Sequence, residues 1–441
     1  MKLFISLLII TILFIPQVVY AQYTTIPVGS FPRALVFNPI NNEFYCANSG
    51  DNTVSIIHAN VNHVMATIRV GTYPCAFAYN KTNNKVYCAN QRSNDVSIIN
   101  GATNEVINTV IVGQRPSALL FDSINDKIYC ANSSGNSVSV IDGVNNNVVA
   151  TINVGGFPTC LTLNSTNNKI YSANTDGNNV TIIDGTTNQV ISTVPVGVSP
   201  SSLAYNPVNN EIYCSSWANG RIHMISGSTN QLVDSIIYGN SGPQSLIYVQ
   251  NNRICYVNFT GDNIKMIDDV SDTIIASYQF PVGTRPYTLA CTPDYIYCAN
   301  IGSNNVSRFF SNNLYLEVTT GIISYPVTII AFFSYHYKIY ITNLWSSTVT
   351  YLLIPAIEEQ SLSDIKDIPI NICPNPAKSF FTISCPLTAN RQTLKLFDIT
   401  GKLIKEVKIT RQEMTIPLNG IRPGIYFVEV GSITEKLVIT N

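Results

Sequence analysis

The segment NEFYCANSGDNTVSII at residues 42–57 decides the fold, because the chain repeats it with few changes. Related segments are NKVYCANQRSNDVSII at 84–99, DKIYCANSSGNSVSVI at 126–141 and NKIYSANTDGNNVTII at 168–183. Each begins 42 residues after the one before it. A fixed spacing of this kind indicates an array built from copies of one supersecondary unit.

Two markers extend the repeat across most of the chain. One is a proline, found at residues 32, 74, 116, 158, 200, 243, 286 and 326. The other is the tyrosine of the YCAN segment, found at residues 45, 87, 129, 171, 213, 256, 297 and 340. Both occur eight times at spacings near 42 residues, which is a period typical of β-propeller blades.

Each repeat contains four short apolar segments. In the second repeat they are residues 75–79, 85–89, 96–99 and 106–112, which are rich in β-branched and aromatic residues. Turns rich in Asn and Gly separate them, and these residues tolerate the positive φ of tight hairpins. The sequence therefore predicts an all-β protein in which each repeat forms a four-stranded antiparallel blade.

The two ends of the array predict how the ring closes. Apolar residues occupy both faces of the strands, so neighbouring blades must cover both sides of each sheet. Residues 23–29 match the end of a repeat, whereas the last repeat, 326–354, stops before its fourth strand. We expect an eight-bladed β-propeller with residues 23–28 as the outer strand of the last blade. Seven blades are the alternative if the irregular last repeat packs elsewhere.

The repeat resembles a known family. Its VGxxP, YxAN and VSVIDGxTNxVIxTI patterns are similar to those of the YVTN-type β-propeller repeat family, with YCAN at 45–48, 87–90, 129–132 and 297–300 and YITN at 340–343. The resemblance covers residues 23–354. It implies the propeller fold and says little about function, since one fold hosts many functions.

Segments outside the repeats define the expected domain organisation. Residues 1–21 combine Lys2, an apolar run at 3–15 and small residues before a cleavage point, which is typical of a secretory signal peptide. An uncleaved N-terminal anchor is the alternative. We expect the propeller at 22–355, a polar linker at 356–366 and a small β-sandwich domain at 367–441.

The C-terminal segment carries a second set of motifs. CPNPA at 373–377, LKLFDITGKLI at 394–404, IPLNGIRPGIYFVEV at 416–430 and EKLVITN at 435–441 resemble the C-terminal sorting domain of the bacterial type IX secretion system. The sequence departs from the family at Cys373, where an aromatic residue is more usual. The alternative interpretation of this domain is an ordinary accessory β-sandwich. The motif residues carried over are Pro374, Asn375, Pro376, Gly401, Gly424 and Lys436. The resemblance implies that the secretion machinery is a partner, that export crosses the periplasm and outer membrane, and that the domain is removed as the protein is released or attached to the surface.

Composition argues against several functions. The net charge of −1 gives no reason to expect a nucleic-acid partner, and no segment after the signal peptide is apolar enough to span a membrane. Four scattered histidines and 11 cysteines without a CxxC motif predict neither a metal site nor a cofactor. We expect equivalent cysteines in adjacent blades, such as Cys46 and Cys88, to be packed and unpaired. For Cys373 and Cys385, the sequence leaves open whether they form a disulfide.

No catalytic residue is predicted. The sequence contains no GxSxG motif, phosphate loop or evident Ser/His/Asp constellation. Asp51, Asp176 and Asp262 stand in loop settings where a carboxylate serves as a turn acceptor more readily than as a general base. The Asp-Gly pairs at 142–143 and 184–185 predict type I′ turns on the opposite side of the propeller.

Ligand binding is expected where the loops that join successive blades meet the loops that follow YxAN. The residue before the repeat proline is often aromatic or Arg, and both tryptophans lie in the second set of loops. The candidate ligand-binding residues are Phe31, Tyr73, Arg92, Arg115, Phe157, Trp217, Arg285, Tyr325 and Trp345. The alternative is that the aromatic rings only pack between blades.

Three functions remain open from the sequence. The leading interpretation is an exported cell-surface or extracellular propeller that acts as a binding or scaffold module, with a surface glycan or a protein as ligand. A propeller enzyme that processes sugars or lactones is the second, and a structural component of the surface coat is the third. The shape and charge of the central opening would separate them.

Overall fold

A computed structural model describes residues 22–237, 242–250, 252–321, 324–333, 337–354, 371–373, 377–384, 393–398, 402–408, 413–430 and 433–440. The chain divides into two compact units, Met1–Pro355 and Ala356–Asn441. The predicted signal peptide at 1–21 and the predicted linker at 356–366 lie outside the described residues. Each unit is described by itself.

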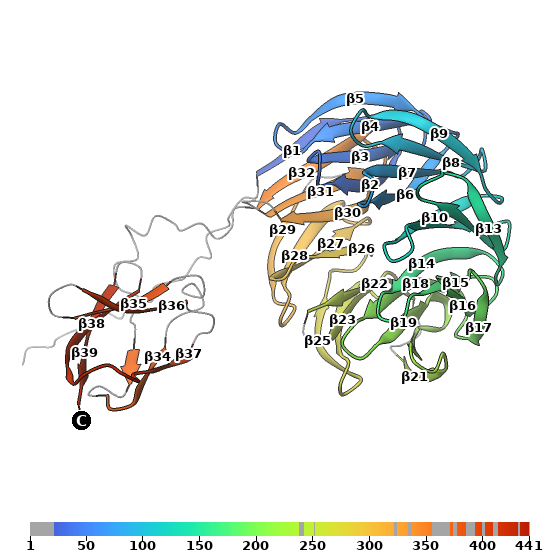
Figure 1. The fold of residues 1–441 in the computed structure, drawn as a ribbon. Coiled ribbons are helices and arrows are strands. Elements are labelled where there is room, and N and C mark those ends of the chain that lie inside the picture. Colours follow the sequence, from blue (N-terminus) through green and yellow to red (C-terminus); the bar gives the residue numbers. More distant parts are fainter. Residues whose placement is uncertain are drawn as a thin grey trace, which may run out of the picture. The chain divides into compact units, whose positions relative to one another are not determined.

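The first unit consists of eight four-stranded antiparallel sheets that follow one another around a ring (Figure 1). The innermost strands β2 (Pro32–Asn38), β6 (Pro74–Asn80), β10 (Pro116–Asp122), β14 (Pro158–Asn164), β18 (Pro200–Asn206), β22 (Pro243–Val249), β26 (Pro286–Cys291) and β30 (Pro326–Phe333) contact one another in this order. Strands β30 and β2 also contact each other, so the ring is closed. The prediction of an eight-bladed propeller is confirmed, and the seven-bladed alternative is wrong because the last repeat forms a blade of its own.

The remaining strands of blades 1 to 4 follow in chain order from the inside to the outside of the ring. Blade 1 adds β3 (Glu43–Asn48), β4 (Thr53–His58) and β5 (His63–Arg69). Blade 2 adds β7 (Lys85–Asn90), β8 (Asp95–Asn100) and β9 (Glu105–Ile111). Blade 3 adds β11 (Lys127–Asn132), β12 (Ser137–Asp142) and β13 (Val148–Asn153). Blade 4 adds β15 (Lys169–Asn174), β16 (Asn179–Asp184) and β17 (Val190–Pro195).

Blades 5 to 8 repeat the plan with small departures. Blade 5 adds β19 (Glu211–Ser216), the 3-10 helix η1 (Trp217–Asn219), β20 (Arg221–Ser226) and β21 (Leu232–Ile237). Blade 6 adds β23 (Arg253–Asn258), β24 (Asn263–Asp268) and β25 (Thr273–Gln279). Blade 7 adds β27 (Tyr295–Asn300), β28 (Asn305–Phe310) and β29 (Leu316–Thr320). Blade 8 adds β31 (Tyr337–Asn343) and β32 (Thr348–Ile354).

The N-terminal strand completes the eighth blade. Strand β1 (Gln22–Pro27) pairs antiparallel with β32, from Gln22 opposite Leu353 to Pro27 opposite Thr348. Ile26 is buried in the core that blades 8 and 1 share. The predicted closure is therefore confirmed, and it removes the open sheet edge that β32 would otherwise present.

The YxAN segment has a structural role at each position, as blade 3 shows. The Tyr129 hydroxyl donates a hydrogen bond to the carbonyl oxygen of Gly185 in blade 4 over 3.1 Å. Cys130 is fully buried between blades. The Asn132 side-chain amide donates to Ser139 Oγ over 3.0 Å and so ties the strand to its hairpin partner. Tyrosine thus joins adjacent blades, while asparagine holds one blade together.

The nine cysteines whose side chains the structure describes are all free, and five of them are fully buried YCAN-type cysteines: Cys46, Cys88, Cys130, Cys214 and Cys298. This agrees with the expectation that equivalent cysteines do not pair. Cys385 lies outside the described residues, so the open question of its pairing with Cys373 lies there as well.

The predicted type I′ turns at the Asp-Gly pairs are wrong. In blade 3 the positive φ, 58°, falls at Asn146 and not at Gly143. The Asp142 carboxylate accepts hydrogen bonds from two backbone amides of the turn, which makes a longer connection. Glycine is required for close packing instead, since a Cβ atom on Gly143 would lie 2.5 Å from the carbonyl oxygen of Asp126.

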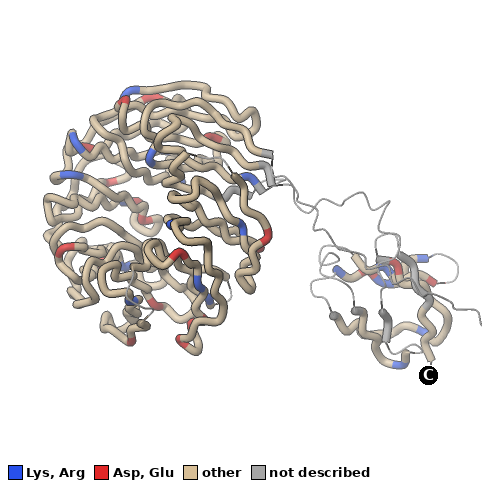
Figure 2. The backbone as a smooth tube through the Cα atoms, turned by 180° about the vertical axis from the view of Figure 1, so that it is seen from behind, with Lys and Arg blue, Asp and Glu red and all other residues tan. Residues whose placement is uncertain are grey.

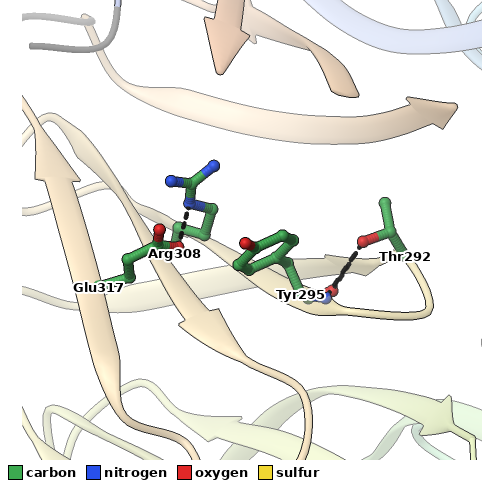
Figure 3. Close-up of polar contacts among 4 residues, drawn as sticks. All are labelled: Thr292, Tyr295, Arg308 and Glu317. Carbon is green, nitrogen blue, oxygen red and sulfur yellow. Dashed lines mark hydrogen bonds and ion pairs between the residues drawn. The ribbon is translucent and has the colours of Figure 1, made fainter. Parts of the chain in front are cut away.

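Blade 7 carries a charged pair inside the propeller (Figure 3). Arg308 Nε of β28 lies 2.7 Å from Glu317 Oε2 of β29, and Arg308 is almost fully buried. Its guanidinium also lies over the ring of Tyr295, 4.7 Å from the centroid. Blade 2 has Ile98 and Ile107 at the equivalent positions. Blade 7 therefore carries an ion pair at positions where blade 2 has two isoleucines, and both blades have the same four strands.

The second unit is a small β-sandwich. One sheet has the order β33 (Asn371–Cys373), β34 (Phe380–Ser384) and β37 (Glu413–Pro417), and the other has the order β36 (Leu403–Lys408), β35 (Thr393–Asp398), β38 (Gly424–Val430) and β39 (Ile433–Ile439). Buried residues of both sheets, including Phe381, Leu396 and Val428, form one core. Within the described residues, no helix is long and apolar enough to cross a membrane.

Candidate functional site

One face of the propeller is built from two sets of loops, which we call the top face. The first set joins the outer strand of one blade to the inner strand of the next, and the second joins the second and third strands of a blade. Backbone hydrogen bonds connect the two sets, as when Ser49 N donates to the carbonyl of Phe31 over 3.0 Å. Gln91 N donates to Tyr73 in the same way over 2.9 Å.

The residue before the repeat proline is held in an unfavourable backbone conformation. Its φ is positive at Phe31 (52°), Tyr73 (62°), Arg115 (54°), Phe157 (56°), Ser199 (56°), Arg285 (49°) and Tyr325 (56°). Side chains other than glycine rarely adopt this region, and a following proline disfavours it further. Asn side chains of the preceding blade compensate, since Asn94 Oδ1 accepts from Arg115 N over 2.8 Å and Asn52 Oδ1 from Tyr73 N over 2.9 Å. Side chains at this position therefore stand on rigid loops.

Loops of blades 2 and 3 enclose a cleft of about 600 Å³ on the top face. It is lined by Tyr73, Gln91, Arg92, Asn94, Gln114, Arg115 and Ser134, and we call it the blade 2–3 cleft. The structure thus brings together three of the nine predicted ligand-binding residues: Tyr73, Arg92 and Arg115. A volume of this size is within the usual range of small-molecule sites.

Two guanidinium groups lie over the Tyr73 ring. Arg92 Cζ is 4.4 Å and Arg33 Cζ is 5.0 Å from the ring centroid. Tyr73 is half-buried, whereas Arg92 and Arg115 are exposed. Within the described residues the one ion pair is Arg308 with Glu317, so neither cleft arginine has a carboxylate partner there. Charged residues are sparse on the propeller, which makes two unpaired arginines in one cleft unusual for this chain (Figure 2).

The other predicted residues form separate contacts around the top face. Tyr325 packs against Trp345 with ring centroids 5.4 Å apart. The Arg285 guanidinium lies 5.9 Å from the ring centroid of Phe259. Trp217 occupies the space that a Cβ atom on Gly242 would need, at 2.3 Å, which accounts for the glycine before that repeat proline.

Two further predicted residues lie outside the cleft. The Phe31 ring lies against Gly50 and is half exposed, and Phe157 is half-buried. The candidate residues therefore do not converge into one ring-shaped site.

Sequence reasoning missed four residues that line the cleft: Gln91, Asn94, Gln114 and Ser134. A signal for two of them was present, because the dipeptide Gln-Arg occurs at 91–92 and again at 114–115 in loops that meet. Arg33 was also missed. It follows the repeat proline at a β-bulge between Pro32 and Ala34, a position with no obvious pattern.

A second hollow of about 380 Å³ lies at the top of blades 6 and 7. Tyr278, Phe280 and Val282 supply its apolar part, and Val282 is 98% exposed. None of its lining residues is charged. This hollow therefore lacks the charged groups that distinguish the blade 2–3 cleft.

Two of the three predicted loop aspartates, Asp51 and Asp262, act as backbone acceptors, whereas Asp176 is exposed. Asp51 Oδ2 accepts from Ser30 N over 2.6 Å, and the Asp262 carboxylate accepts from Gly283 N and Arg285 N over 2.7 and 2.6 Å. In the described part of the chain, no group of three His, Cys, Asp or Glu residues could hold a metal ion. Burial raises the pKa of the Cys75 thiol, two residues beyond Tyr73, to about 12, so this thiol is a poor nucleophile.

Comparison with known families identifies the second unit. Residues 371–440 match the family described as "Secretion system C-terminal sorting domain". This unit is a sorting domain of the type IX secretion system. It directs the chain to the cell surface or the extracellular space and implies contact with the secretion machinery. Of the predicted motif residues, Gly424 begins β38 and Lys436 lies in β39 opposite Phe427, whereas Pro374, Asn375, Pro376 and Gly401 lie outside the described residues.

A curated relative covers only a small part of the chain. Beta-agarase A of Zobellia galactanivorans is 25% identical over 101 residues, which are 22% of this chain and 19% of that enzyme. The chain therefore spans about a fifth of that relative's length, and the enzyme's activity is not carried over.

Solved structures resemble the propeller in fold. Sqt1 of Saccharomyces cerevisiae has a TM-score of 0.67 at 11% identity and covers 76% of this chain and 98% of its own. The computationally designed Ika8 protein has a TM-score of 0.63 at 15% identity, and the match covers 75% of this chain and 99% of the designed protein. Virginiamycin B lyase from Staphylococcus aureus has a TM-score of 0.52 at 17% identity, and the match covers 64% of this chain and 94% of the lyase. At these identities the likeness concerns the fold alone.

Proposed function

We propose that this protein is an exported binding module whose propeller recognises a ligand through its top face. The observation that carries the proposal is the blade 2–3 cleft, where Tyr73, Arg92 and Arg115 stand on loops fixed by backbone and asparagine hydrogen bonds. Rigid loops remove the backbone part of the ordering cost of binding, which favours recognition. The sorting domain supports a location where such a surface meets extracellular ligands.

We also propose the domain organisation that the sequence predicts. It consists of a signal peptide at 1–21, a YVTN-type propeller at 22–355, a linker at 356–366 and the sorting domain at 367–441. The protein would enter the periplasm through the signal peptide and leave it through the secretion machinery.

The two alternative functions are less well supported by the cleft. The general acid or base of a sugar- or lactone-processing enzyme is most often a His, Asp or Glu, and none of these lines the cleft. A coat protein needs no cleft with unpaired charges.

Thermal melts combined with ligand screening test the proposal. The full mature chain and its Tyr73→Ala and Arg115→Ala variants would be screened against a glycan array and cell-surface extracts, with the outer-strand variant Arg69→Ala as control. Binding through the blade 2–3 cleft of the top face predicts weaker binding by Tyr73→Ala and Arg115→Ala with nearly unchanged melting temperatures. Pure packing predicts a loss of about 3 kcal/mol or more for Tyr73→Ala without any change in binding, and that result would contradict the proposal.

A further inference from the structure

The side chains that line the blade 2–3 cleft share one chemical property. Arg92 and Arg115 are cationic, Gln91 and Gln114 carry amide groups, and no lining residue is acidic. Arg115 N is bonded to Asn94, but the Arg115 guanidinium has no hydrogen bond or ion pair within the described residues. The Arg115 guanidinium group presents two parallel N–H donors and stands on a rigid loop. It can therefore donate two hydrogen bonds to one carboxylate or sulfate group.

Comparison among blades shows that the pair of arginines is specific to one junction, because Arg285 fills the position of Arg115 before blade 7 but Thr260 stands there at the position of Arg92. Ser134, Asp176 and Ala218 occupy the position of Arg92 in blades 3 to 5. The position of Arg115 is filled by Phe157 and Ser199 in blades 4 and 5. The backbone is the same in each case, with φ of 56° at both Phe157 and Ser199. The repeat therefore supplies the scaffold, while one pair of loops supplies two arginines that the fold does not require.

Tyr73 contacts two guanidinium groups of the protein itself. Because Arg92 and Arg33 lie over its ring, Tyr73 is engaged by guanidinium groups and holds Arg92 in place. Stacking of a ligand ring on Tyr73 would have to displace a cation–π contact. The cleft is therefore suited to charged groups more than to flat apolar ones.

We infer that the blade 2–3 cleft binds an acidic polysaccharide through carboxylate or sulfate oxygens held by Arg92 and Arg115. The inference rests on the proposed function and names its ligand class. The Gln91 and Gln114 amides and the Ser134 hydroxyl supply donors and acceptors suited to sugar hydroxyl groups. A peptide usually anchors through an apolar side chain in a pocket, and the cleft has no aliphatic lining residue.

Binding measurements with defined probes test the inference. Calorimetric titrations would use the full mature protein with oligogalacturonate, sulfated dextran oligomers, unsulfated dextran oligomers of equal length and oligoglutamate. We expect binding to oligogalacturonate, sulfated dextran or both, and none to unsulfated dextran. The first two probes distinguish carboxylate from sulfate as the group recognised.

Variants connect that binding to the cleft. Arg115→Ala and Arg92→Ala should each weaken it by about tenfold or more, as the loss of a charged hydrogen bond does. Arg115→Lys keeps the charge but loses the fork, so it should recover only part of the affinity. Arg69→Ala removes the same charge from an exposed position of β5 and should change affinity less than twofold.

Each contrary result has a distinct meaning. Equal losses in Arg69→Ala and Arg115→Ala would indicate nonspecific attraction and overturn the inference. Preference for oligoglutamate would assign the cleft to acidic peptides and also overturn it. Binding to unsulfated dextran alone, lost in Tyr73→Ala, would overturn the anionic ligand but leave the proposed binding function standing. No binding to any probe would contradict the inference, while the ligand screen would still decide the proposed function.

Discussion

The junctions between blades depend on the residue at the start of each second strand. In blade 3 this residue is Lys127, whose Nζ lies 2.8 Å from the Gly185 carbonyl oxygen and 3.1 Å from Asn188 Oδ1 in blade 4. Blade 5 has Glu211 instead, and the facing turn of blade 6 has Asp269 and Asp272 at the positions of Gly185 and Asn188. The junction of blades 5 and 6 therefore gathers carboxylates, whereas the junctions on either side hold the Lys169 ammonium group and the Arg253 guanidinium group.

This exchange makes the junction of blades 5 and 6 sensitive to pH. Burial, followed by the charges of Glu211 and Asp272, raises the pKa of Asp269 to about 7, against about 3.9 in an unfolded chain. The folded state thus binds the proton more tightly. The stability that protonated Asp269 contributes to the folded state is complete below about pH 4, and it is lost as the pH rises to about 7.

We predict that Asp269→Asn flattens the pH dependence of stability. The variant should melt at a higher temperature than the wild type at pH 8 and at nearly the same temperature at pH 4, because the amide mimics the protonated acid. Thermal melts between pH 4 and 8 measure this. Asp176→Asn, which removes the same charge from an exposed loop residue, is the control. An unchanged pH slope in Asp269→Asn would refute the assignment.

At the scale of strands and loops, the repeat made the fold predictable. Because one pattern occurs eight times, the position of each strand in the sequence can be checked against the other copies. The pairing of β1 with β32 could therefore be expected, since residues 23–29 match the end of a repeat. Turn type was less predictable. Asp142-Gly143 meets the sequence rule for a type I′ turn, but the glycine is required by contact with Asp126 of the adjacent hairpin, a tertiary effect.

The candidate site was only partly predictable for a related reason. In the sequence, the residue before the proline is equivalent in every repeat. This equivalence suggests one ring of side chains on the top face. Which of them meet depends on local partners: Tyr325 is paired with Trp345, while Tyr73 is paired with Arg92 and Arg33. Arg33 enters through a β-bulge, which shifts the strand register and is not evident from the apolar pattern.

Closure by β1 is testable by deletion. Removing residues 22–28 should expose the edge of β32 and lose the burial of Ile26, so we predict a lower melting temperature and concentration-dependent aggregation. Light scattering and thermal melts measure both. Tyr23→Ala, which alters an exposed side chain and keeps the strand pairing, should behave as the wild type. A monomeric deletion variant with an unchanged melting temperature would argue against closure.

At the scale of the whole molecule, delivery and the proposed ligand recognition belong to separate units. The propeller holds the cleft, and the sorting domain has a core of its own. Because the two units are compact in themselves, loss of one should leave the other folded. For the proposed function, the sorting domain must bring the propeller to the place where its top face can meet a ligand.

Cell fractionation of a truncated chain tests whether the sorting domain delivers the propeller. In a bacterium with a type IX secretion system, the full chain and its Arg115→Ala variant should reach the cell surface or the medium. The chain lacking residues 365–441 should accumulate in the periplasm with the melting temperature of the intact propeller. Recovery of the truncated, folded propeller from the surface or the medium in the same amount as the full chain would contradict the account.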